Sequence, residues 1–292
     1  ARRMASAPPV ALAGQAPRPA QRATKQGEPY LIPEPAGPAA VIVLAAGAGT
    51  RMKSRTPKIL HEIGGRSMVG YALLAARSIN PGRLALVVRH ERDLVARYLN
   101  ELDPEALIVD QDHVPGTGRA VEVAVQAPDD PEKLAGPVVV TYGDVPLLTG
   151  SLLADLVATH EREANAVTVL TALLSDATGY GRILRGDDSS VTGIREHKDA
   201  TEAERLIREV NSGIYAFDAD VLRDALVHIT TDNSQGEKYL TDVLGIARQA
   251  GGRVAAVVTE DRWQVEGAND RVQLSALGAE LKAELHAGIE KG

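Results

Sequence analysis

The chain has 292 residues, of which 44% are hydrophobic and 24% are charged, as in an ordinary globular protein. A net charge of −7 and an aromatic content of only 3% argue against a protein that coats nucleic acid or stacks bases on aromatic side chains. Cysteine is absent, which excludes disulfides, thiolate metal sites and cysteine nucleophiles. No apolar run approaches the roughly 20 residues of a membrane span, so we expect a cytoplasmic protein that binds neither membrane nor nucleic acid.

Residues 1–38 differ in composition from the rest of the chain. They hold eight of the 16 prolines and no acidic residue before Glu28. Such a segment buries too little apolar surface to offset the entropy of ordering it, so we predict a disordered extension. Its Arg/Ala-rich start resembles a transit peptide superficially, and a flexible extension is the favoured interpretation.

From Ala39 onward, short apolar runs alternate with segments of helical periodicity. The pattern predicts, in chain order, strand 40–45, helix 66–80, strand 84–88, helix 91–102, strand 106–109, helix 117–127, strand 138–141 and helix 151–163. This alternation is typical of an α/β fold with a Rossmann-like, mostly parallel sheet that is covered by helices on both faces.

After about residue 164 the alternation ends and the chain becomes richer in strands. The later elements are predicted to be strands 166–172, 181–184, 191–195 and 213–217, helices 219–228 and 239–250, strand 253–258 and helix 270–287. We expect a mixed sheet, with a β-rich part that lies over the carboxyl ends of the first strands.

The most informative segment runs from Leu44 to Lys58 and follows the first strand directly. It therefore lies at the carboxyl edge of the sheet, where α/β folds bind their ligands. Gly47 and Gly49 allow the backbone to approach an anion closely. The segment also concentrates positive charge, carried by Arg51, Lys53, Arg55 and Lys58. Position 52 is Met rather than a third glycine, which excludes a P-loop and a Rossmann dinucleotide motif and leaves a simple basic turn as the alternative.

Polar residues follow other strands of the predicted sheet. Asp144 follows strand 138–141 and is suited to hold a hard cation such as Mg²⁺, although an Asp in a turn before a helix is also common for local reasons. Gln111 carries both a donor and an acceptor, the pair that reads a pyrimidine edge, and Thr117 is a plausible cap of the helix that follows. Asn269 is either a helix cap or a neutral oxygen ligand of a cation.

The order of several motifs resembles a known family. The motifs are LAAGAGTRM with a following PK, Q-x4-GTG, YGDVPLL, GYGRI, E-x-KDA, VNSGIY, GEKYLTD and VEGAND. Together they are similar to the nucleotidyltransferase domain of bacterial N-acetylglucosamine-1-phosphate uridyltransferase, the first half of a bifunctional enzyme that also acetylates glucosamine-1-phosphate. The similarity covers about residues 39–290. It implies one nucleotidyltransferase domain, with a nucleotide-binding part at 39–164 and a sugar-binding part at 165–290.

The resemblance implies a role for particular residues. Uridine would be held by Leu44, Ala45, Ala46, Gly47, Gln111, Gly116 and Thr117. Arg51 and Lys58 would be catalytic and would hold the triphosphate. Asp144 and Asn269 would ligate Mg²⁺, the expected cofactor, with Tyr142 and Gly143 beside them. The N-acetylglucosamine site would be lined by Gly181, Glu196, Asn211, Tyr239 and Thr241.

The resemblance also implies the partners and the limits of this chain. The substrates would be UTP and N-acetylglucosamine-1-phosphate, and the products UDP-N-acetylglucosamine and pyrophosphate, for peptidoglycan and cell-wall precursor synthesis. The family's β-helix would begin about where this chain ends, so we expect no acetyltransferase activity, and a trimer only with that β-helix. The chain departs from the family pattern at four positions: Arg119 where the family usually has His, Lys238 where it often has Tyr, Val114 at a loop position that can carry a polar contact, and Arg195 in place of the usual aliphatic residue before Glu196.

Three alternatives remain open at this point. One is a nucleotidyltransferase for another sugar-1-phosphate or another nucleotide. The second is a nucleotide-sugar sensor without catalysis, which the presence of Arg51, Lys58, Asp144 and Asn269 disfavours. The third is an NAD(P) oxidoreductase, which the missing third glycine disfavours.

Overall fold

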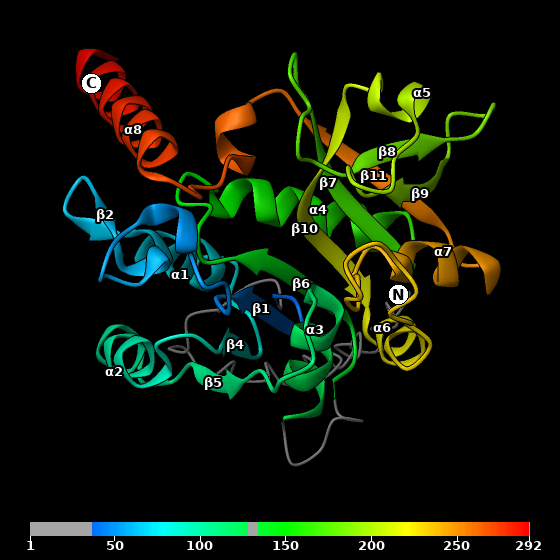
Figure 1. Cartoon of the computed structure of the whole chain (residues 1–292), viewed down its shortest axis with the longest axis horizontal. Coiled ribbons are helices and arrows are strands. Elements are labelled where there is room, and N and C mark those ends of the chain that lie inside the picture. Colours follow the sequence, from blue (N-terminus) through cyan, green and yellow to red (C-terminus); the bar gives the residue numbers. More distant parts are fainter. Residues whose placement is uncertain (1–36, 128–133, 292) are drawn as a thin grey trace, which may run out of the picture. The chain divides into compact units, whose positions relative to one another are not determined.

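The computed structural model describes residues 37–127 and 134–291, which belong to one compact unit of the chain. The extension predicted over residues 1–38 lies, apart from its last two residues, outside the described part. Seven strands form a continuous path in the order β11-β7-β10-β6-β1-β4-β5, and β8 and β9 extend the sheet beside β10 (Figure 1). The strands are β1 Ala40–Leu44, β4 Leu84–Val88, β5 Leu107–Asp110, β6 Pro137–Tyr142, β7 Val167–Leu173, β8 Arg182–Arg185, β9 Val191–Arg195, β10 Glu209–Asp218 and β11 Val254–Thr259.

The sheet is mixed and mostly parallel, as the sequence pattern predicts. Strands β6, β1, β4 and β5 are parallel to one another, whereas β10 runs antiparallel to both β6 and β7. A short hairpin, β2 Glu62–Ile63 with β3 Arg66–Ser67, stands apart from this sheet and was not predicted. The parallel strands end at one edge, and the loops that follow them can therefore converge there.

Helices cover both faces of the sheet. They are α1 Met68–Arg77, α2 Arg92–Leu102, α3 Thr117–Gln126, α4 Gly150–Arg162, α5 Glu202–Arg205, α6 Ala219–Leu226, α7 Asp242–Gln249 and α8 Arg271–Lys291. Alternate residues of β1 divide between the two cores, because successive side chains of a strand point to opposite faces. Ile42 packs with α3, α6 and α7, and Val43 packs with α1, α2 and α4. Both residues are almost completely buried, so β1 lies at the centre of the fold.

The element boundaries differ from the predicted ones by a few residues. Helix α1 begins at Met68 rather than at residue 66, because the Ser67 hydroxyl caps it by accepting from the Gly70 N–H at 3.0 Å. The predicted cap at Thr117 is wrong, since Gly116 precedes α3 there without a side-chain cap. Helix α4, predicted over 151–163, is capped by the Thr149 hydroxyl, which accepts from the Leu152 N–H at 3.3 Å. None of the described helices combines the length and the apolar character that crossing a bilayer requires.

Candidate active site

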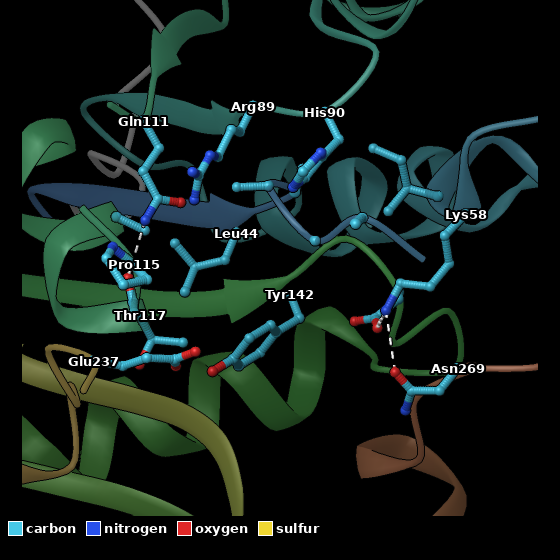
Figure 2. A pocket seen from close by; sticks show the side chains of 18 residues that line it. Leu44, Lys58, Arg89, His90, Gln111, Pro115, Thr117, Tyr142, Glu237 and Asn269 are labelled. Atoms are coloured by element: carbon cyan, nitrogen blue, oxygen red, sulfur yellow. Dashed lines mark hydrogen bonds and ion pairs between the residues drawn. The ribbon is translucent and has the colours of Figure 1, made fainter. Parts of the chain in front are cut away.

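A cavity of about 400 Å³ opens at the carboxyl edge of the parallel strands (Figure 2). Its walls come from the segments that follow β1, β5 and β6, as the sequence predicts. Of the residues that the family resemblance assigns to the nucleotide or to the metal, the cavity is lined by Leu44, Ala45, Ala46, Gly47, Lys58, Gln111, Gly116, Thr117, Tyr142, Asp144 and Asn269. Gly143 lies behind the wall, where its N–H donates to the Leu44 carbonyl at 3.0 Å. The structure thus brings these residues together around one cavity.

The glycine-rich segment after β1 is held against Lys58. Gly49 has φ +61°, and a Cβ atom there would lie only 2.5 Å from the Cβ atom of Lys58, so this position requires glycine. The Arg271 guanidinium of α8 donates to the backbone carbonyls of Met52 and Lys53, at 3.0 and 3.1 Å. These contacts fix the segment at both ends of its turn and set the position from which Lys58 enters the cavity.

The Lys58 ammonium joins the two predicted metal ligands. It donates to the Asp144 carboxylate and, at 3.2 Å, to the side-chain carbonyl of Asn269 (Figure 2). The side chains of Lys58 and Asp144 are only 12% and 14% exposed, so water screens this ion pair weakly. The three residues come from distant parts of the sequence and meet at one point.

Asn269 is available to the cavity because its neighbour serves as the helix cap. The Asp270 carboxylate accepts from the N–H groups of Val272 and Gln273, both at 2.9 Å, at the start of α8. The alternative reading of Asn269 as that cap is therefore wrong. A further bond, from the Ala268 N–H to the Asp144 carbonyl at 3.0 Å, ties the loop of Asn269 to the loop of Asp144.

Arg51 does not line the first cavity. It lines an adjoining cavity of about 310 Å³, together with Tyr142, Asp144 and Asn269. Since three residues are shared by both cavities, the two form neighbouring parts of one site. Asp144 thus borders both the cavity of Lys58 and the cavity of Arg51, and Arg51 is exposed whereas Lys58 is nearly buried.

The side-chain amide of Gln111 has a fixed orientation. Its Nε2 donates to the carbonyls of Val114 and Gly116, both at 3.1 Å. The opposite orientation would set the amide oxygen against those two carbonyls, so the bonds determine which atom points which way. The NH₂ group of the amide therefore donates within the loop, and only Oε1 remains to bind a ligand. The sequence predicts that Gln111 offers a ligand both a donor and an acceptor, and the structure leaves only the acceptor.

The segment 236–242 is attached to the Gln111–Gly118 loop by its backbone. The Lys238 N–H donates to the Pro115 carbonyl at 3.1 Å, and the Lys238 carbonyl accepts from the Gly118 N–H at 2.8 Å. The Thr117 hydroxyl accepts from the Leu240 N–H at 3.2 Å. Thr117 therefore joins two segments instead of capping its own helix.

Ion pairs of Arg119 and Lys238 reinforce this attachment. The Arg119 guanidinium contacts the carboxylates of Asp112 and Glu122, at 2.7 and 2.9 Å, and the Lys238 ammonium contacts Glu122 at 3.0 Å. The hydrogen bond from Arg119 lowers the pKa of Asp112 to about 2. Burial opposes ionisation of Glu122, but bonds from Arg119 and Lys238 outweigh it and lower the pKa of that carboxyl. Lys238 thus contributes a charge that is paired with Glu122 of α3.

The residues assigned to the sugar form a second polar group. The Thr241 hydroxyl donates to Glu196 Oε1 at 3.4 Å, and the Asn211 N–H donates to the Gly181 carbonyl at 2.9 Å. A Cβ atom on Gly181 would meet Asn211 at 3.4 Å and Glu196 at 3.5 Å. Tyr239 lies close by, since Glu196 contributes to raising its pKa, an effect to which burial contributes most. All five predicted residues therefore lie near one another.

Tyr142 connects the sugar group to the two cavities. Gly213 has φ +84° and leaves room for the Tyr142 ring, because a Cβ atom there would lie 2.5 Å from the ring. Burial raises the pKa of the Tyr142 hydroxyl, and the charges of Asp144 and Glu196 add to that effect. Burial likewise raises the pKa of Glu196, and the carboxylates of Asp199, Asp242 and Glu237 add to it.

Seven of the 18 residues that line the first cavity (Figure 2) were not predicted as site residues, and three of the seven, Arg89, His90 and Glu237, carry ionisable side chains. Arg89 and His90 follow β4 directly; in Figure 2 the side chain of Arg89 lies beside Gln111, and that of His90 lies farther along the cavity toward Lys58. Both residues directly follow a buried strand, and this is the same signal that indicated Asp144. Glu237 lines the opposite wall and belongs to the GEKYLTD motif, of which only Tyr239 and Thr241 were assigned a role.

The described residues contain no cluster of three His, Asp or Glu side chains that could hold a metal ion by themselves. The pair Asp144 and Asn269 nevertheless presents oxygen atoms, which Mg²⁺ prefers, and these two oxygens converge on one cationic group in this structure. The residues present therefore fit Mg²⁺, provided that substrate phosphates supply the other ligands.

Comparisons with known proteins identify relatives of this chain. The "Bifunctional protein GlmU" of Pseudarthrobacter chlorophenolicus is 80% identical over 264 residues, which cover 89% of this chain and 54% of the relative. That of Paenarthrobacter aurescens is 81% identical over 264 residues, covering 89% and 53%. The resemblance drawn from the motifs is thus confirmed, although the chain spans about half the length of these curated relatives.

Solved structures and a family model complete the comparison. A crystal structure of UDP-glucose pyrophosphorylase complexed with UDP-glucose superimposes with a TM-score of 0.66 at 18% identity, over 84% of this chain and 99% of that one, which confirms the predicted fold class. The model of the MobA-like NTP transferase domain matches residues 41–212. The chain therefore belongs to the MobA-like NTP transferase domain family.

Proposed function

We propose that this chain is a uridylyltransferase that makes UDP-N-acetylglucosamine and pyrophosphate from UTP and N-acetylglucosamine-1-phosphate. The observation that carries the proposal is the convergence of Lys58, Asp144 and Asn269 between a cavity suited to a nucleotide and a polar group suited to a sugar. Family membership and the ordered motifs support the same reaction. We infer that residues 39–164 provide most of the nucleotide site and residues 165–290 most of the sugar site, and a cytoplasmic location stays a prediction.

Recognition of uracil follows from the orientation of Gln111. Its free Oε1 can accept the N3–H of uracil, whereas cytosine carries an acceptor at the same position and would repel it. The backbone of Leu44–Gly47 and the Gly116–Thr117 turn would enclose the base and ribose, since they line the same cavity. The site therefore favours UTP over CTP because Gln111 Oε1 can only accept a hydrogen bond.

The phosphates would lie between Lys58 and Arg51. The phosphate oxygen of the sugar substrate attacks the α-phosphorus of UTP, the bond from that phosphorus to the bridging oxygen breaks, and pyrophosphate leaves. Because the attacking oxygen is already an anion, no general base is needed, and positioning and charge neutralisation do most of the work. Lys58 would neutralise the α-phosphate and Arg51 the departing pyrophosphate.

Asp144 and Asn269 would hold Mg²⁺ by one oxygen each, together with phosphate oxygens. When bound, the ion neutralises charge that builds on the phosphates during the transfer. Glu196, Asn211, Gly181, Tyr239 and Thr241 would hydrogen-bond the hydroxyl and acetamido groups of the sugar. Asn211 uses its side-chain oxygen within the protein, accepting from Gly213 N–H and Tyr215 O–H, both at 2.9 Å, and so presents its NH₂ group as a donor.

The proposal is tested by incubating the chain with UTP, Mg²⁺ and N-acetylglucosamine-1-phosphate and identifying the products by mass. UDP-N-acetylglucosamine and pyrophosphate in equal amounts support it. Faster release of pyrophosphate with another sugar phosphate or another nucleotide would replace the substrate assignment. No magnesium-dependent pyrophosphate release with any pair would instead favour a sensor of nucleotide sugars.

A further inference from the structure

Lys58 occupies the place that the proposed function gives to a divalent cation. Its ammonium donates to Asp144 and to Asn269, whose oxygen atoms are the candidate metal ligands. A Mg²⁺ ion bound to both would lie about 2.0–2.1 Å from each oxygen, within the space that the ammonium fills. Two cations at that separation repel each other strongly, and Lys58 is only 12% exposed, so little water screens the repulsion.

We propose that the Lys58 ammonium and a divalent cation compete for the oxygens of Asp144 and Asn269. The cation then binds well only when a phosphate offers Lys58 another anionic partner. The inference rests on the proposed function, because it takes the nucleotide's phosphate as that partner. It makes Lys58 both a phosphate ligand and the group that prevents the site from filling with free metal.

The local structure limits where Lys58 can move. Its backbone is fixed at the start of a short 3₁₀ turn, Lys58–Leu60, where its carbonyl accepts from the His61 N–H at 3.2 Å. Its Cβ atom faces Gly49, which leaves no room for a side chain there. The ammonium can therefore leave Asp144 only by rotation of its side chain, and the first cavity, which Lys58 also lines, is the space available to it.

Removing the Lys58 charge should therefore strengthen metal binding, which is the opposite of what a simple supporting role would give. Without the ammonium, the Asp144 carboxylate stays poorly solvated and unpaired, and a divalent cation relieves that penalty. A merely structural Lys58 would, when replaced, loosen the two ligands and weaken metal binding.

The test measures the affinity for Mn²⁺ alone, by the electron paramagnetic resonance signal of the free ion, without nucleotide or turnover. Lys58→Met should bind Mn²⁺ on the order of tenfold more tightly than the unaltered chain. Lys53→Met is the matched control, because it removes the same charge from an exposed position of the same segment and should change the affinity by less than about twofold. Asp144→Asn combined with Lys58→Met should abolish the gain.

Two further measurements keep the inference open to refutation. Lys58→Gln should also tighten Mn²⁺ binding, so the result does not depend on one variant folding. Inorganic sulfate, an analogue of phosphate, should tighten Mn²⁺ binding to the unaltered chain and have no effect on Lys58→Met. Unchanged or weaker binding in the Lys58 variants, or an equal gain in Lys53→Met, overturns the competition. Because no step of the test needs turnover, it can fail while the uridylyltransferase assay succeeds, and the reverse.

Discussion

The backbones of Gly116 and Lys238 are in direct contact. A Cβ atom on Gly116, which has φ +111°, would lie 2.3 Å from the Lys238 carbonyl oxygen. The Gln111–Gly118 loop, here called the nucleotide loop, thus packs against the segment that carries Tyr239 and Thr241 without a side chain between them. Whatever moves one of these segments moves the other, so the candidate nucleotide and sugar sites are mechanically joined at this point.

Gly116→Ala should disrupt both sites. The methyl group meets backbone atoms that cannot rotate away, so we expect the KM for UTP to rise about tenfold or more, and the protein to lose about 1–3 kcal/mol of stability. Gly236→Ala is the matched control, because Gly236 also has positive φ, +65°, but its Cβ would meet nothing within 4 Å. Steady-state kinetics and denaturant unfolding measure the KM for UTP and the stability of both variants. Equal changes in Gly116→Ala and Gly236→Ala would contradict the packing argument.

Gln111→Glu should weaken UTP binding although it changes few atoms. The substitution replaces the NH₂ group that donates to two carbonyls by an oxygen that repels both. We expect a rise in the KM for UTP of about ten- to a hundredfold, as for the loss of one or two buried hydrogen bonds. An unchanged KM for UTP in this variant would show that the bonds which orient the Gln111 side chain do not matter for binding the base.

Asp144→Asn should reduce kcat by about 10²–10³, equivalent to roughly 3–4 kcal/mol, because it removes a charge that positions the phosphates and their cation. Asp155→Asn on the exposed face of α4 serves as the control and should be near wild type. The measurement is pyrophosphate release at saturating substrates, with folding checked by circular dichroism. A tenfold or smaller loss would remove Asp144 from the mechanism.

Glu196→Gln should stabilise the protein while it impairs sugar binding. Because burial raises the pKa of Glu196 above its ordinary 4.5, the folded state holds this proton more tightly than the unfolded state. Stability of the unaltered chain therefore falls as pH rises from about 4.5 through the raised pKa, and the variant escapes that loss.

We expect Glu196→Gln to be more stable than the unaltered chain at pH 7, with the difference vanishing below pH 4.5, and the KM for the sugar phosphate to rise about tenfold. Denaturant unfolding across this pH range measures the first effect. The exposed Glu202→Gln should show neither effect, and a Glu196→Gln variant that is less stable at pH 7 would contradict the argument.

Arg119→Met should loosen the nucleotide loop in a manner that depends on pH. The hydrogen bond from Arg119 is the largest of the causes that lower the pKa of Asp112 from 3.8 to about 2, with the Val114 N–H and the charge of His113 adding to it. The stabilisation from this lowered pKa is present above pH 3.8 and is lost as pH falls through about 2. At pH 7 we expect the Tm to fall by about 2–4 °C and the KM for UTP to rise a few-fold. The Tm difference should shrink steadily below pH 4, and a difference independent of pH would show that packing of the side chain, not its charge, is what matters.

Buried strands and the residues after them could be predicted from the sequence. The five apolar residues of β4 and the Gly-rich turn after β1 are local signals, and the carboxyl edge of a parallel sheet follows from topology. The order of the strands was beyond local patterns, because β10 enters between β6 and β7 through pairings of distant residues. The hairpin β2–β3 was missed since each strand has only two residues.

In the candidate site, too, some features could be predicted from the sequence and others could not. Motif spacing indicated Asp144, Asn269 and Gln111, but not that Asp270 caps α8 and leaves Asn269 to face Lys58 from 211 residues away. The orientation of the Gln111 amide depends on two carbonyls whose positions are set by the fold of the loop. The meeting of Asn269 with Lys58 is a property of tertiary packing, and no local pattern in the chain encodes it.

The insertion of β10 between β6 and β7 has a consequence for protein engineering. Strand β6 ends at the loop of Asp144, and β10, which is hydrogen-bonded to β6, carries Asn211. The candidate nucleotide site and the candidate sugar site are therefore built on neighbouring strands of one sheet. A chimera spliced at residue 164 would pair strands of different parentage at the middle of the sheet, where Tyr215–Asp218 of β10 lie beside Pro137–Val140 of β6. Transplanting a new sugar preference should therefore succeed by exchanging the loops at the strand ends, and fail by exchanging halves of the gene.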